Sequence, residues 1–172
     1  PRENGGNADI RQLTRGARLQ IPVNVEGALF SLGDAHYAQG DSECCITAIE
    51  TGATAVVRFK LLPGEARRNG MRFPRFSHPG WFAAPQWAAP HNFVATTGLP
   101  IREDGTQECE DLTLAARNAL LEMILLLGER GFSREQAYVI CSLAVDLRIS
   151  NAVDLPNVTV SALLPEAIFE RN

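Results

Sequence analysis

The chain lacks the features that mark nucleic-acid-binding, membrane-spanning and disulfide-rich proteins. Lys60 is its only lysine and the formal net charge is −4, so the basic stripe that nucleic acid requires is missing. The most apolar stretch, residues 120–127, is too short to cross a bilayer, and no targeting pattern is visible. We therefore expect no nucleic-acid partner, no membrane association and a cytoplasmic location.

Cysteine is also scarce, and its spacing excludes two common uses. The four cysteines, at positions 44, 45, 109 and 141, form no C-x-x-C pair of the kind that binds zinc. Neighbouring cysteines rarely bridge each other, so buried reduced thiols are expected rather than a disulfide framework.

What is present indicates an α+β protein with a sizeable core, since 45% of the 172 residues are hydrophobic. Residues 1–62 read as a β-rich segment, sandwich- or barrel-like, with strands expected at 18–25, 28–33, 43–51 and 53–62. Residues 63–91 form a connector rich in proline, glycine and aromatic residues.

Residues 92–172 read as an α+β region with two main helices. A strand is expected at 93–97, a helix at 112–128 and a final strand at 158–164. Ser133 followed by Gln136 predicts a capping box at the start of the second helix. The first helix becomes apolar almost all round near its end, which predicts that it is buried.

The most informative segment is a short acidic run between glycines, residues 33–43. It carries Asp34, His36, Asp41 and Glu43, whose like charges need water, a proton or a metal ion to offset them. Residues i and i+2 of extended chain share a face, so a hairpin with residues 37–40 as its loop would bring all four side chains together. A divalent-metal or acid/base centre is one interpretation, and a solvated turn is the other. The apolar flanking segments favour the centre.

Further segments in the same order strengthen the first interpretation. Gly33-Asp34-Ala35-His36, Gly40-Asp41-Ser42-Glu43 and Ala48-Ile49-Glu50 follow one another, and Asn4-Gly5-Gly6-Asn7-Ala8-Asp9 precedes them. With these segments the chain resembles the acetamidase/formamidase family, whose members carry a run close to G-D-x-H-x-x-x-G-D-G-E before a strand ending in A-I-E.

The resemblance continues along nearly the whole chain, through residues 90–98, 130–138 and 142–150. Ser42 stands where the family usually has glycine, and Cys45-Ile46 replaces a smaller pair, which bears on substrate choice more than on the reaction. Family members are longer, so the resemblance implies a C-terminal portion that works with an N-terminal companion chain or a missing N-terminal half, in a homo-oligomer.

The resemblance implies hydrolysis of short primary amides, such as formamide or acetamide, to an acid and ammonia. A divalent metal is expected, zinc first and calcium as the alternative, with Asp34, His36 and Asp41 as ligands. Glu43 is the expected general base and then the proton donor to the departing nitrogen, with Asp41 and His36 as further catalytic groups. Asp41 is alternatively the group that orients His36.

Four other polar residues are candidates for contacts with substrate or with the site, each with a simpler interpretation. Asn7 and Asp9 follow two glycines, where turn capping competes. His91 precedes a strand and also reads as a loop residue. Asp146 lies among apolar residues beside Arg148, where a structural ion pair competes.

Two alternative functions stay open. A thiol-dependent amidase would use Glu43, Lys60 and Cys44 or Cys45, although both cysteines lie in an expected strand rather than on an exposed turn. A non-catalytic β-rich module would use the acidic run to hold calcium as a scaffold.

Overall fold

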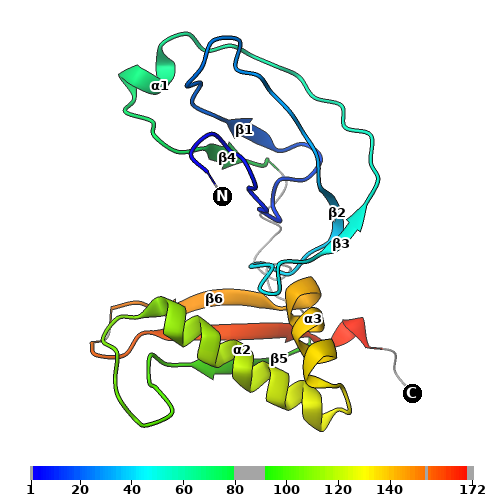
Figure 1. Cartoon of the computed structure of the whole chain (residues 1–172), viewed down its shortest axis with the longest axis vertical. Helices are drawn as coiled ribbons and strands as arrows, with labels where there is room; N and C mark the ends of the chain where they lie inside the picture. The colour runs from blue at the N-terminus through cyan, green and yellow to red at the C-terminus, as the bar shows by residue number, and fades with distance from the viewer. Residues whose placement is uncertain (1, 80–91, 154, 170–172) are drawn as a thin grey trace. The chain divides into compact units, whose positions relative to one another are not determined.

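The computed structural model of the chain describes residues 2–79, 92–153 and 155–169 (Figure 1). The chain divides into two units, each described here by itself. Unit 1 comprises residues 1–35 and 50–88, and unit 2 comprises residues 36–49 and 89–172. The segment that carries His36, Asp41 and Glu43 therefore belongs to the same unit as the C-terminal half of the chain.

Unit 2 is built on a three-stranded antiparallel sheet of β5 (Phe93–Gly98), β6 (Asp146–Asn151) and β7 (Thr159–Pro165), in the order β5-β7-β6. The central strand β7 alternates half-buried and buried residues, as expected for a strand with one face on a core. The strands expected at 93–97 and 158–164 are confirmed. Strand β6 was not expected, although its alternating Leu147 and Ile149 carry the same period of two.

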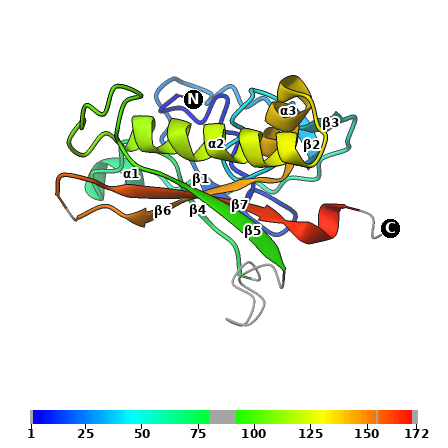
Figure 2. The same cartoon turned by 90° about the horizontal axis from the view of Figure 1, so that it is seen from below.

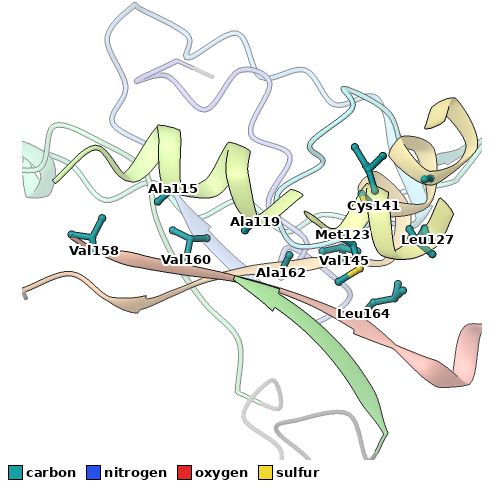
Figure 3. Packing of buried hydrophobic residues seen from close by; sticks show 12 residues of the cluster. Ala115, Ala119, Met123, Leu127, Cys141, Val145, Val158, Val160, Ala162 and Leu164 are labelled. Atoms are coloured by element: carbon teal, nitrogen blue, oxygen red, sulfur yellow. The ribbon is translucent and has the colours of Figure 1, made fainter. Parts of the chain in front are cut away.

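Helix α2 (Leu112–Glu129) lies over one face of this sheet (Figure 2). Ala115, Ala119, Met123 and Leu127, spaced four apart, are fully buried toward the strands (Figure 3). The expected helix is confirmed, but its end is not buried all round, because Leu125 is 59% exposed. The core of unit 2 is therefore a stripe of α2 packed on alternate residues of β7, chiefly Val160, Ala162 and Leu164.

A glycine fixes how closely α2 approaches the sheet. A Cβ atom on Gly98, at the end of β5, would lie 2.1 Å from the Ala115 carbonyl oxygen and 2.3 Å from the Ala119 nitrogen. Beside it, the Thr96 hydroxyl donates to the Ala119 carbonyl at 2.7 Å. The strand thus packs directly on the backbone of the helix, which only glycine permits.

Helix α3 (Arg134–Ala144) begins with the expected capping box, which is confirmed. The Gln136 N–H donates to the Ser133 hydroxyl at 3.2 Å, and the Ser133 N–H donates to the Gln136 side chain at 2.9 Å. Ala137 and Cys141 bury the inner face of α3. After β7 the chain forms the short helix η2 (Glu166–Ile168).

Unit 1 has much less regular structure than its sequence predicts. Strands β1 (Arg18–Gln20) and β4 (Arg75–Ser77) pair antiparallel, and α1 (Glu65–Arg68) is a single turn. The strand expected at 18–25 is shorter, and those expected at 28–33 and 53–62 are not formed. Both segments are largely exposed, with left-handed backbone at Ala28 and Leu29, and the described part of the chain offers neither segment a neighbouring strand. The sandwich- or barrel-like arrangement is therefore not seen among the described residues.

The acidic run does not form the expected hairpin. Strands β2 (Ala35–Ala38) and β3 (Ile49–Thr51) form a two-stranded sheet, and residues 39–48 form the connection between them. The strand expected at 43–51 is therefore confined to its last three residues. Asp41 and Glu43 lie in a loop, so the i, i+2 argument does not apply to them.

Among the helices of the described ranges, none has the length and apolar character that crossing a membrane requires.

Candidate active site

The loop of residues 39–48, which carries Asp41 and Glu43, is fastened to helix α3 and strand β6 within unit 2. Its first anchor is Gly40, whose N–H donates to the Ser142 carbonyl at 2.9 Å. That carbonyl is one of those that a helix leaves without a partner at its C-terminal end. A Cβ atom on Gly40 would lie 2.5 Å from the Val145 oxygen and 2.9 Å from the Ser142 oxygen, so no side chain fits there.

Ser142 provides the second anchor, through its side chain. Its hydroxyl, on a fully buried residue, donates to the Thr47 carbonyl at 2.6 Å and accepts from the Cys45 N–H at 3.1 Å. One hydroxyl therefore satisfies a donor and an acceptor of the loop backbone, as a buried hydroxyl must. Sequence reasoning passed over Ser142, and its place in the segment 142–150 was the only signal for it.

Tyr138 provides the third anchor, one turn earlier on α3. Its hydroxyl donates to the Cys44 carbonyl at 2.6 Å. Burial is the main cause that raises the pKa of Tyr138, followed by the nearby thiols, so the phenol keeps the proton that this hydrogen bond needs.

Asp146 acts on the backbone of Asp41. Its carboxylate accepts the Asp41 N–H at 3.1 Å, and the Leu147 N–H donates to the Asp41 carbonyl at 3.1 Å. Asp146 is the residue for which sequence analysis left a site contact and an ion pair with Arg148 open. The structure shows it holding the loop from the start of β6.

Glu43 lies at the turn of the anchored loop. It is half-buried with φ of +48°, and Ser42 before it has φ of +156°, at the edge of the range that favours glycine. Left-handed backbone at a non-glycine residue costs on the order of 1 kcal/mol or more, and the anchors on both sides of the turn hold it. The glycine that the family usually carries at position 42 fits this geometry.

His36 lies half-buried on strand β2. Its Nδ1 atom is 3.0 Å from the Gln39 side-chain oxygen, so Nδ1 carries the proton and Nε2 carries the lone pair. In this tautomer an imidazole can bind a metal through Nε2, and Gln39 makes an orienting contact of the kind for which Asp41 was considered.

Unit 1 brings together three of the other predicted residues. The carboxylates of Asp9 and Asp34 offer oxygens within 4.8 Å of one another, and the Asn7 side chain donates to Asp9 at 3.0 Å. Asp34 directly precedes strand β2 and has φ of +60°. Asp9 was expected only as a secondary contact, yet it lies beside the predicted ligand Asp34. His91 lies outside the described residues.

Two thiols of unit 2, those of Cys44 and Cys141, are poor nucleophiles. Burial, with a smaller contribution from Cys45, raises the pKa of Cys44 to about 11, and burial raises that of Cys141 to about 12. Both are therefore protonated at neutral pH, whereas a catalytic cysteine needs a lowered pKa. Among the described residues, Cys44 thus lacks the environment that the thiol alternative requires.

Comparison with known proteins identifies the family of the chain. The model of the acetamidase/formamidase family matches residues 1–171. The chain belongs to this family. It is 34% identical over 172 residues to a formamidase from Methylophilus methylotrophus and 38% identical over 142 residues to an acetamidase from Mycolicibacterium smegmatis. The formamidase match covers 99% of this chain and 41% of that relative, and the acetamidase match covers 81% of this chain and 34% of that relative.

A solved structure shares the fold as well. The gamma lactamase from Delftia acidovorans superimposes with a TM-score of 0.81 at 34% identity, covering 100% of this chain and 41% of that protein. This member of the acetamidase/formamidase family thus spans about two fifths of the length of the formamidase and of the lactamase that it matches.

Proposed function

We propose that this chain supplies acid/base and metal-binding residues to an amidohydrolase that converts short primary amides to a carboxylic acid and ammonia. The observation that carries the proposal is the family match over residues 1–171, together with the anchored loop that presents Asp41 and Glu43. The complete enzyme would include either an N-terminal companion chain or a longer form of this one, and a homo-oligomer and a cytoplasmic location stay predictions.

A divalent cation fits the donors that unit 1 and the start of β2 supply. Asp9 and Asp34 offer hard oxygens close together, and His36 follows Asp34 by two residues with its lone pair on Nε2. We propose Asp34 and His36 as ligands, with Asp9 joining them and Asp41 as a further candidate. Such an ion, zinc first and calcium as the alternative, would polarise the amide carbonyl or acidify a bound water.

Glu43 is the proposed proton carrier. A carboxylate can accept the proton of the attacking water and then deliver it to the departing nitrogen, which must be protonated to leave as ammonia. The anchors at Gly40, Ser142 and Tyr138 hold its loop in one conformation before substrate arrives. A preset position matters because a misplacement of about 1 Å can cost about 100-fold in rate.

The test of this role is Glu43→Gln, which keeps the size of the side chain and removes its acid/base capacity. We expect ammonia release from formamide and acetamide to fall by about 10²–10⁴-fold, with metal content and thermal unfolding unchanged. Glu103→Gln, on an exposed loop, is the matched control and should keep full activity. Full activity in the Glu43 variant would remove Glu43 from the mechanism.

The substrate range of the enzyme, its metal content and the presence of a companion chain are tested on the same preparation. Intact mass spectrometry shows whether a second polypeptide accompanies the chain, and elemental analysis identifies the metal. A γ-lactam belongs in the substrate panel because a structural relative is a gamma lactamase. Calcium as the only metal, with no ammonia released from any amide, would support the scaffold alternative instead.

A further inference from the structure

Residues 53–61 of unit 1 have the pattern of a half-buried strand. Along this segment apolar side chains occupy every second position: Ala55, Val57, Phe59 and Leu61. The positions between Val57 and Leu61 hold Arg58 and Lys60. On an extended chain the first set faces one side and the charged pair faces the other, which is the period expected of a strand with one face on a core.

The structure leaves this strand-like segment without a sheet. No backbone hydrogen bond involves residues 53–61 in the part of the chain that is described. Every residue from 51 to 61 is exposed, with Val56 at 97% and Leu61 at 77%. Figure 1 shows the segment as a long extended trace between β3 and α1. Unpaired backbone with apolar side chains is what an edge strand offers to another chain.

A second exposed segment lies beside the first. The ring of Phe30 packs edge-on against that of Phe59, with centroids 4.9 Å apart. Near Phe30, Leu29 is 78% exposed and Leu32 is 63% exposed. The two segments therefore meet at Phe30 and Phe59, and together with the exposed apolar side chains that flank these two rings in the chain they are here called the open strand surface. Exposed apolar side chains that gather in this way mark interaction sites.

We propose that the open strand surface is where the rest of the longer enzyme binds, with residues 53–61 pairing as a strand with it. The chain spans 41% of the length of the formamidase that it matches, so about three fifths of that length is available to cover this surface. A second copy of this chain fits less well. Antiparallel pairing of two copies about Phe59 would place Arg58 of one opposite Lys60 of the other, and like charges directly opposite are destabilising.

The proposal does not depend on the catalytic roles above. Its test measures co-purification and amide exchange rather than activity. The probe is the part of the Methylophilus methylotrophus formamidase outside the matched segment, co-expressed with this chain as a separate polypeptide. We expect the two to co-purify and the amides of residues 53–61 to exchange at least about 100-fold more slowly than in the chain alone. Failure to co-purify, or co-purification without this protection, would overturn the proposal. Protection that grows with the concentration of the chain alone would assign the surface to a second copy.

Two proline variants test whether the backbone makes the contact. Successive N–H groups of a strand point to opposite edges, so Val56→Pro removes a donor from one edge and Val57→Pro removes one from the other. At least one variant should reduce the co-purified probe about tenfold or more, while leaving thermal unfolding of the chain alone unchanged. Val56→Thr and Val57→Thr keep the N–H groups and should retain the probe. If both proline variants retained as much probe as the unsubstituted chain, main-chain pairing would not be involved.

Discussion

The two units of this chain differ in where their apolar side chains find partners. In unit 2, a stripe of α2 and alternate residues of β7 bury one another, and Leu127 and Leu164 are fully buried. In unit 1, Leu29, Val56 and Leu61 are all more than 60% exposed, on segments that join no sheet among the described residues. Both sequences contain apolar segments, and the difference lies in available neighbours: a helix forms its own hydrogen bonds, whereas a strand needs a second chain segment.

The largest expected effect contrasts one leucine from each unit. Leu164→Ala removes a fully buried side chain from β7 and should lower the free energy of unfolding by about 2–5 kcal/mol, from lost burial and the cavity left behind. Leu61→Ala, at a residue 77% exposed, should change it by no more than about 0.5 kcal/mol. Chemical denaturation of both variants measures this, and equal effects would mean that unit 1 has a core of its own in solution.

An intermediate effect is expected at the anchor of the active-site loop. Ser142→Ala leaves the Cys45 N–H and the Thr47 carbonyl without their buried partner, which should cost about 1–3 kcal/mol. Amide exchange at Cys45 should accelerate, and kcat for amide hydrolysis should fall more than KM changes. Ser150→Ala, which loses only an exposed contact with Ser161, is the control and should stay near wild type. A loop unchanged in exchange would show that Gly40 and Tyr138 suffice to hold it.

The smallest effect concerns rates of thiol labelling rather than stability. Burial raises the pKa of Cys44 to about 11, so the folded protein holds that proton more tightly than the unfolded chain, and thiolate appears only as the pH rises toward 11. At pH 8, iodoacetamide should therefore label the exposed Cys109 well before Cys44 or the buried Cys141. Peptide mass spectrometry gives the order, and rapid labelling of Cys44 without loss of fold would reopen the thiol alternative.

The elements predicted correctly from the sequence are those whose signals are local. The capping box at Ser133, the helix from Leu112 and the strands at 93–98 and 159–165 all form within unit 2, where each has its partner. Strand β6 was missed because its alternation comprises only two apolar residues, Leu147 and Ile149. The strands expected at 28–33 and 53–62 do not form, because apolar alternation shows that a segment is suited to a strand and does not supply the neighbour.

For the site, too, the sequence indicates local features but not their distant partners. The acidic run drew attention to Asp34, His36, Asp41 and Glu43 through composition alone, but it suggested a hairpin, whereas Asp41 and Glu43 lie on a loop fastened to α3 and β6. The contacts that hold this loop join residues about 95 to 105 positions apart in the chain. Spacing within a run cannot reveal such partners. The nearness of Asp9 to Asp34 depends in the same way on the fold of unit 1.

The loop that carries Asp41 and Glu43 is held through its own backbone, by the N–H groups of Gly40, Asp41 and Cys45 and the carbonyls of Asp41, Cys44 and Thr47. The partners of these groups lie on α3 and β6, about 95 to 105 positions further along the chain. A substitution on α3 or at the start of β6 can therefore shift Asp41 and Glu43 without altering either residue.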